Sequence, residues 1–386
     1  MTTVLLGARV VGSPGQLGDD VGWLRIDEGM ITATGIGAPS PAAIAGAAVT
    51  TDLGGRWVVP GFVDVHCHGG GGASVYSGVL DDVVKAARTH LATGTTSMLA
   101  SVATTELGSM LAATSVVADA IDAGLVPNVV GIHLEGPFLS PRRRGAQTAA
   151  ALLPPDPEVL ERLLAAGRGH VRTMTIAPEL PGATDLIRAN AARLRFSLGH
   201  TDADAEQFRA GIEAGARMAT HLFNAMPPLL HRAPGAVGAA LTDERVTVEL
   251  VSDGMHVDDL VLRLAYATAG RARMMTVTDA SPAAGLGDGD YRFADRHITV
   301  DGGVARIYGT DTLAGSAVTL GEVLPRLVGR AGFTLEDTAE IMSATPARAI
   351  GLDDRGTLRV GARADLVVLG PEFRPQAVMS NGTWIE

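Results

Sequence analysis

The sequence contains little cysteine and little positive charge relative to its acidic residues. Cys67 is the single cysteine among 386 residues, which excludes an internal disulfide and a zinc cluster built from several thiolates. Acidic residues outnumber basic ones by 42 to 31, so the formal net charge is -11 and nothing favours binding to phosphate backbones or anionic lipids. We therefore expect neither nucleic acid nor a membrane as a partner.

Long apolar runs are also absent. The hydrophobic segments are short and interrupted, and the first residues, MTTVLLGARV, lack the basic start, apolar stretch and cleavage site of a signal peptide. Since nothing favours an oxidising compartment either, we expect the protein in the cytoplasm. The composition, 46% hydrophobic and 19% charged, is typical of a folded globular protein.

The two ends of the chain are predicted to combine into one small β-sandwich domain. Residues 1–58 have short strand-like segments separated by Gly, Pro and Asp turns, without a helical period. The expected strands are 3–11, 22–26 and 30–34. Residues 356–386 return to the same pattern, with an Asn-Gly turn at 381–382.

Residues 59–355 are predicted to form a separate α/β domain. Short β-rich runs alternate there with longer stretches of helical spacing, as in βα units of a parallel sheet. The eight expected strands are 62–65, 95–99, 129–134, 171–176, 195–198, 217–220, 246–251 and 274–278. An open doubly wound sheet would give the same local pattern, but polar residues at the ends of many strands favour a (β/α)8 TIM barrel. A hairpin insertion is expected at 285–312.

His66 and His68 end the first barrel strand, in VPGFVDVHCHGGGG. Because side chains alternate along a strand, the two imidazoles project to one side while Cys67 faces away as a packing residue. The two histidines can therefore converge on one ion.

Glu135, His200 and His221 follow strands three, five and six. Glu135 comes directly after a buried strand, where a charged group needs a buried partner such as a cation. One carboxylate and two imidazoles form a ligand set that leaves an open position for water, as catalytic zinc sites require. His133 is expected to project elsewhere, either next to the site or into the core.

Asp253, His256 and Asp279 follow the last two strands. A metal ion lowers the pKa of bound water, and a neighbouring carboxylate can take its proton and pass it to a leaving group, the role we assign to Asp279. His256 can donate to a carbonyl oxygen that becomes an oxyanion. Asp253 precedes a glycine and is expected to bond the turn backbone.

These motifs together resemble the amidohydrolase superfamily and, within it, the N-acetylglucosamine-6-phosphate deacetylase family. The resemblance covers nearly the whole chain and depends on the order of its motifs. These are VPGFVDVHCHG, GIHLEGPFLSP, IAPEL, GHTDA, THLFNAMPP, DGMHVD, TDA, LAGS and GTLRVGARADLVVL. HLEGP together with THLFNAM is the most specific part.

The resemblance implies a metal-dependent enzyme that hydrolyses the acetamide of N-acetyl-D-glucosamine 6-phosphate to D-glucosamine 6-phosphate and acetate, in amino-sugar catabolism or recycling. Metal-bound hydroxide would be the nucleophile, with Asp279 as general base and then acid. Zn²⁺ is the favoured ion, and Fe²⁺, Co²⁺ or Mn²⁺ also suit His and carboxylate ligands. The implied ligands are Glu135, His200 and His221 at the principal site, with His66 and His68 for a second ion.

The resemblance also implies which residues contact the substrate. These are Asn224, Ala225, Arg232, His256, Leu313, Ala314 and Gly315. Arg232 matches a phosphate clamp that reaches across a homodimer interface. Gln147 replaces a family histidine near the sugar, and it can hydrogen-bond but carries no charge. The single lysine, Lys85, lies in an expected helix, so Glu135 takes the place of the carboxylated lysine that bridges two metals in many amidohydrolases.

Three alternatives stay open. The nearest is the same chemistry on N-acetylgalactosamine 6-phosphate or another N-acyl amino sugar. Dihydroorotase or dipeptidase activity is a second, against which the missing bridging lysine counts. A sugar-phosphate sensor without catalysis is a third, and the presence of Asp279 beside the metal-binding positions argues against it, since a binding module needs no proton shuttle.

Overall fold

The chain divides into two compact units. A computed structural model gives the fold and describes residues 1–12, 20–293 and 296–386. The first unit comprises Met1–Asp64, His90–Ser97 and Leu320–Glu386, and the second comprises Val65–Thr89 and Met98–Thr319. All of the predicted site residues belong to the second unit.

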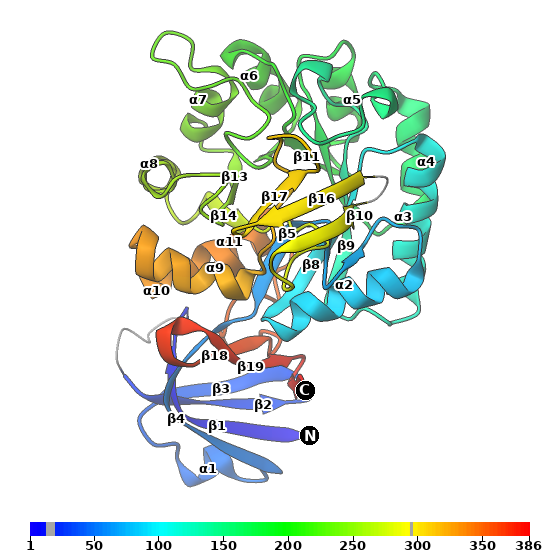
Figure 1. The fold of residues 1–386 in the computed structure, drawn as a ribbon. Helices are drawn as coiled ribbons and strands as arrows, with labels where there is room; N and C mark the ends of the chain where they lie inside the picture. Colours follow the sequence, from blue (N-terminus) through cyan, green and yellow to red (C-terminus); the bar gives the residue numbers. More distant parts are fainter. Residues whose placement is uncertain (13–19, 294–295) are drawn as a thin grey trace. The chain divides into compact units, whose positions relative to one another are not determined.

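Strands from both ends of the chain form one seven-stranded sheet in the first unit, in the order β20-β19-β18-β4-β1-β2-β3. Their bounds are β1 (Thr2–Val10), β2 (Gly22–Asp27), β3 (Met30–Ile36), β4 (Val49–Pro60), β18 (Leu366–Leu369), β19 (Pro375–Ser380) and β20 (Thr383–Trp384). β4 pairs in parallel with β1 and antiparallel with β18, so the N-terminal and C-terminal strands, blue and red in Figure 1, lie side by side. Their buried side chains, among them Leu24, Leu366 and Met379, share one apolar core.

The predicted Asn-Gly turn joins β19 to β20. Asn381 and Gly382 have φ angles of 51° and 74°, left-handed values that suit a tight hairpin. The helices of this unit are short: α1 (Pro41–Ile44), α9 (Leu320–Arg326), α10 (Leu335–Ala339) and α11 (Thr345–Ala349), with π-helical turns at Leu327–Ala331 and Glu340–Ala344.

Eight parallel strands form the barrel. In hydrogen-bonding order they are β14 (Met274–Val277), β13 (Thr247–Val251), β12 (Met218–Ala219), β11 (Arg195–Leu198), β10 (Val171–Ile176), β9 (Val129–Glu135), β8 (Thr95–Ala103) and β5 (Phe62–Cys67). The ring closes where Cys67 pairs with Ala280 and the Asp279 N–H donates to the His66 carbonyl at 2.8 Å. β5 and β8 are buried along their whole length, as expected for strands covered on both faces.

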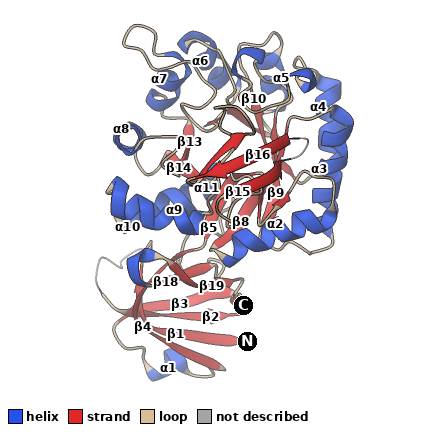
Figure 2. Cartoon of the chain, in the orientation of Figure 1, coloured by secondary structure: helices blue, strands red, loops and turns tan. Residues whose placement is uncertain are grey.

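Helices alternate with the barrel strands and lie around them (Figure 2). They are α2 (Leu80–Ala92), α3 (Leu107–Asp122), α4 (Pro157–Ala166), α5 (Ala183–Asn190), α6 (Ala205–Ala214), α7 (Gly235–Thr242) and α8 (Asp259–Ala269). Acidic caps begin several of them. Asp204, for example, accepts from two backbone N–H groups of α6, while Gln207 caps in return. α3 and α7 are rich in alanine and largely apolar, so periodicity does not indicate them.

The predicted insertion is a small antiparallel sheet of β15 (Gly289–Phe293), β16 (Arg296–Asp301) and β17 (Val304–Ile307). The Asp288 carboxylate accepts from the backbone N–H groups of Gly302 and Gly303 and holds the turn between β16 and β17. A second pair, β6 (Gly69–Gly70) and β7 (Ala73–Ser74), follows β5.

The predicted fold class is confirmed: an α/β chain with a (β/α)8 barrel and a small β domain assembled from both chain ends. The strands of that domain, predicted as a sandwich, form one seven-stranded sheet. The exact boundaries at 1–58, 59–355 and 356–386 stay predictions. Among the described residues, every helix is too short or too polar to cross a bilayer.

Candidate active site

A cavity of about 280 Å³ lies at the carboxyl ends of the barrel strands. The predicted residues that line it are His68, Glu135, Gln147, His200, His221, Asn224, Ala225, His256, Asp279, Leu313, Ala314 and Gly315. His66 is fully buried and contacts the same carboxylates. Arg232 is exposed and does not line this cavity.

Glu135 lies between two groups of histidines. Its Oε1 is 3.0 Å from His200 Nε2 and 3.3 Å from His221 Nε2. The same oxygen is 3.4 Å from His66 Nε2, while Oε2 is 3.3 Å from His68 Nε2. Within each group the ligand atoms lie within 4.8 Å of one another, so one carboxylate can serve two cation positions.

Hydrogen bonds at Nδ1 orient the histidine rings. His68 Nδ1 is 2.9 Å from the Ser101 carbonyl, and His200 Nδ1 is 2.9 Å from the Arg143 carbonyl. Because a carbonyl only accepts, each Nδ1 carries a hydrogen and each Nε2 faces the centre. The Nε2 atoms of His200 and His221 are 3.0 Å apart, a spacing that requires a proton or a cation between the lone pairs. These donors fit a divalent metal ion.

Three of these side chains stand at positions with unusual backbone. His200, His221 and Asp279 have φ angles of 48°, 28° and 47°, in the left-handed region that non-glycine residues rarely adopt. The chain turns sharply at the end of each strand and directs the side chain into the barrel mouth. Gly315 allows its backbone to lie close to that of Asp279, since a Cβ at this position would lie 2.6 Å from the Asp279 carbonyl.

Opposite charges shift the pKa values of the cluster. Burial alone would lower the pKa of His66 and His68, but Asp279 and Glu135 raise the pKa of His68 to about 9 and that of His66 well above its usual range. Burial would raise the pKa of Glu135 and Asp279, but the neighbouring histidines hold both below their usual values. Without a metal, protons on His66 and His68 would balance the two carboxylates.

Asp253 holds His256, which faces the cavity after β13. One Asp253 oxygen is 2.7 Å from His256 Nδ1. The other accepts from the backbone N–H groups of Met255 and His256, as predicted for this turn. Burial would lower the pKa of His256, but Asp253 raises it.

Gln147 is buried and uses both ends of its amide. The Thr104 N–H donates to its Oε1 at 2.9 Å, and its Nε2 donates to Glu135 Oε2. Arg296, at the start of β16, donates to the Ala146 carbonyl and so ties this loop to the insertion. The substrate contact expected of Gln147 stays a prediction, and the structure adds a contact with the shared carboxylate.

Glu249 contacts the site but is not among the residues predicted from the sequence. It is 1% exposed, and its Oε2 is 3.1 Å from His66 Nδ1. The available signal was a lone glutamate in the apolar run VELV, comparable to the signal for Glu135. Glu249 lies inside β13 rather than at its end, so its position along the strand did not indicate it.

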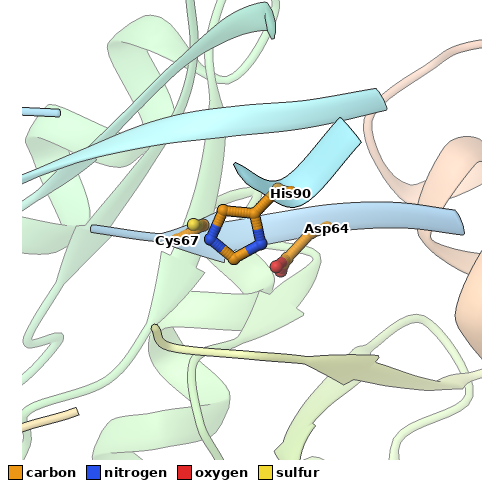
Figure 3. A group of neighbouring side chains, drawn as sticks. All are labelled: Asp64, Cys67 and His90. Atoms are coloured by element: carbon orange, nitrogen blue, oxygen red, sulfur yellow. The ribbon is translucent and has the colours of Figure 1, made fainter. Parts of the chain in front are cut away.

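Other ionisable side chains lie outside the cavity lining. His133 bonds to Ser101 Oγ at 2.9 Å and Thr175 Oγ1 at 2.8 Å, so both of its ring nitrogens are engaged away from the ligand groups. Figure 3 draws Asp64 and Cys67 on β5 and His90 on α2, all of them buried. The Cys67 thiol is 3.6 Å from the Gly69 carbonyl, and the packing role expected of this residue stays a prediction.

The model of the amidohydrolase family matches residues 57–385. The chain belongs to the amidohydrolase family. Amidohydrolases are metal-dependent, and this amidohydrolase has two candidate metal-binding groups around Glu135. The predicted family is therefore confirmed.

Several relatives of this amidohydrolase match most of its length. N-acetylglucosamine-6-phosphate deacetylase of Homo sapiens is 37% identical over 347 residues, covering 86% of this chain and 84% of the relative. N-acetylgalactosamine-6-phosphate deacetylase of Escherichia coli O157:H7 is 33% identical over 385 residues, 99% of each chain. A mutant N-acetyl-D-glucosamine-6-phosphate deacetylase of Mycobacterium smegmatis, solved in complex with N-acetyl-D-glucosamine-6-phosphate, is 41% identical with a TM-score of 0.92 over 99% of both chains.

The raised pKa of His68 predicts how the stability of the metal-free protein depends on pH. A histidine whose pKa is higher in the folded state stabilises the fold fully below its unfolded pKa, 6.5, and this contribution is lost as pH rises through the folded value, about 9. We expect the melting temperature of the metal-free wild type to fall more steeply than that of His68→Asn between roughly pH 7 and 9.5. Calorimetry at a series of pH values measures both slopes, and equal slopes would contradict the assignment.

Proposed function

We propose that this amidohydrolase removes the acetyl group of N-acetyl-D-glucosamine 6-phosphate, giving D-glucosamine 6-phosphate and acetate. The observation that carries the proposal is the Glu135 carboxylate between two histidine groups, with Asp279 3.3 Å from His68 in the same cavity. Relatives and a solved structure that bear the name of this deacetylase support the substrate. The proposed location is the cytoplasm, and the role is in amino-sugar catabolism or recycling.

The metal is proposed to be a divalent cation, with Zn²⁺ favoured and Fe²⁺, Co²⁺ or Mn²⁺ as alternatives. One ion would be held by Glu135, His200 and His221, and a second by His66, His68 and Glu135. When bound, such an ion polarises a carbonyl and lowers the pKa of water towards neutrality.

Asp279 is proposed to move the proton of the reaction. Its carboxylate lines the cavity and lies 3.3 Å from His68 and 3.5 Å from His66, next to the proposed metal site, where it would be placed to accept a proton from the attacking water. As the C–O bond forms and the C–N bond breaks, Asp279 returns that proton to the amine nitrogen, since an unprotonated amide nitrogen leaves poorly.

His256 is proposed to stabilise the carbonyl oxygen while it carries negative charge. Its Nδ1 is engaged by Asp253 at 2.7 Å, which leaves Nε2 as the nitrogen available to the substrate. A fixed ring orientation is useful here because the donor needs no rearrangement when the charge develops.

The other predicted substrate-contacting residues in the cavity are proposed to recognise the sugar. They are Gln147, Asn224, Ala225, Leu313, Ala314 and Gly315, all of which line the cavity. The same chemistry on N-acetylgalactosamine 6-phosphate is a second candidate, which the Escherichia coli O157:H7 relative of that name favours.

Arg232 is proposed to bind the substrate phosphate of a neighbouring subunit in a homodimer. It is exposed and lies outside the cavity lining of its own chain. Leu229 and Leu230, nearby in the sequence, are 41% and 53% exposed, which is favourable for contact with a second copy.

The activity is tested by acetate release. We expect the purified protein to release acetate from N-acetyl-D-glucosamine 6-phosphate, to lose this activity after exhaustive chelation, and to regain it with added Zn²⁺. Parallel assays with N-acetylgalactosamine 6-phosphate and unphosphorylated N-acetylglucosamine rank the substrates. Full activity of the metal-free protein, or no release from any of these sugars, would refute the proposal.

Replacement of Asp279 tests the proton transfer. Asp279→Asn preserves the size of the side chain but removes its basicity, so kcat should fall about 10²- to 10⁴-fold. Metal content, measured by elemental analysis, and the far-ultraviolet dichroism spectrum should stay close to those of the wild type. A variant with unchanged kcat would show that another group moves the proton.

Replacement of Arg232 tests the phosphate contact. Arg232→Ala should raise KM for the phosphorylated sugar by about tenfold or more, the value of one charge-assisted contact. Activity on unphosphorylated N-acetylglucosamine should not change. Arg188→Ala, which removes another exposed arginine on α5, is the matched control. An equal loss on both sugars would argue against phosphate binding, and light scattering on each protein determines whether the dimer exists.

A further inference from the structure

Glu249 is a buried carboxylate that the proposed reaction does not use directly. Its neighbours in β13 are apolar, and it is 1% exposed, so its charge must be balanced by contacts inside the barrel. Its oxygen Oε2 contacts two residues of the site. His66 Nδ1 lies at 3.1 Å, and the backbone N–H of His221 donates at 3.3 Å.

The contact between Glu249 and His66 determines which ring nitrogen of His66 faces Glu135 and Asp279. With Nδ1 directed at Glu249, His66 Nε2 lies 3.4 Å from Glu135 Oε1 and 3.5 Å from Asp279 Oδ1. Ligating histidines commonly donate their other nitrogen to a carboxylate or carbonyl, which fixes the tautomer and raises the basicity of the ligand. His68 has a carbonyl in this position, whereas His66 has a carboxylate.

The contact with His221 acts on the backbone. His221 has a φ of 28°, a strained value, and its N–H is held by the Glu249 side chain. The next residue, Leu222, donates its N–H to the Glu249 carbonyl at 2.8 Å. The turn that directs His221 towards Glu135 is thus bonded to both the side chain and the main chain of Glu249.

We propose that Glu249 is a positioning residue that fixes one ligand of each histidine group, His66 through its ring and His221 through its backbone. This inference rests on the proposed metal site and deepens it. Glu249 does not itself line the cavity, so it acts through the two histidines. Its effect is therefore on metal affinity rather than on substrate affinity.

The test compares metal binding by metal-depleted variants. Glu249→Gln keeps the size and one acceptor oxygen but removes the charge, and Glu249→Ala removes both. Ser252→Ala is the matched control, because Ser252 is also buried just after β13 and its hydroxyl contacts Thr276 and the Leu250 carbonyl. Zn²⁺ titration against a chromophoric chelator gives the affinity for each ion that the protein binds.

We expect Glu249→Gln to lower the affinity for at least one ion by about 10- to 100-fold, the usual effect of losing such a partner. KM should change less than about twofold, and Ser252→Ala should bind metal like the wild type. In a His66→Asn background the effect of Glu249→Gln should become smaller, because the part that passes through the His66 ring is already lost, while the part that passes through the His221 backbone remains. If Glu249→Ala fails to fold, Glu249→Gln and the cycle with His66 carry the test.

Unchanged affinity of Glu249→Gln for every ion bound by the wild type would overturn the proposal, whatever the number of ions. A raised KM with normal metal affinity would overturn it as well. Metal affinity is measured independently of the reaction. If the metal affinity depends on Glu249 but the protein releases no acetate, the proposed function is refuted and the positioning role of Glu249 stands.

Discussion

The Glu135 carboxylate is the constraint around which the site is organised. It is buried, and a buried carboxylate is costly unless positive charge and hydrogen bonds surround it. His200 and His221 approach one oxygen, while His68 and Gln147 approach the other. Because the Glu135 carboxylate contacts both histidine groups, a displacement of Glu135 would disturb both of them together. The outer nitrogens of His66, His68 and His200 are bonded to the Glu249 carboxylate and to the Ser101 and Arg143 carbonyls, respectively.

The barrel explains how residues more than two hundred positions apart reach one carboxylate. His66 lies near the end of the first strand and Asp279 follows the last, and the ring closes by a hydrogen bond between their own backbones. The left-handed backbone at His200, His221 and Asp279 carries a local cost that the eight paired strands can sustain. Left-handed backbone occurs elsewhere in the chain as well, but at these three positions it directs the proposed ligands and proton carrier.

The sequence was informative where a polar residue directly followed an apolar strand. His66 and His68 could be placed on the same side of their strand because side chains alternate. Glu135 could be identified because a buried charge needs a partner. Glu249 could not be assigned in this way, because a glutamate inside a strand faces either the barrel interior or its helices, and only the register of the closed barrel decides. The contact between Gln147 and Glu135 likewise depends on how a loop packs, which residue spacing does not determine.

Two pairs, each made of a carboxylate and a histidine, lie beside Glu135 and the cavity. Asp253 orients His256, which faces the cavity, while Glu249 orients His66, which is buried among the ligand groups. In both pairs the carboxylate binds Nδ1 and leaves Nε2 for the reacting side, so the ring orientation is fixed before a substrate arrives. Groups fixed in this way stabilise a developing charge without rearranging, which water at the same positions could not do. Both carboxylates belong to β13 or to the loop that follows it, so this part of the barrel fixes the orientation of two histidine rings at the site.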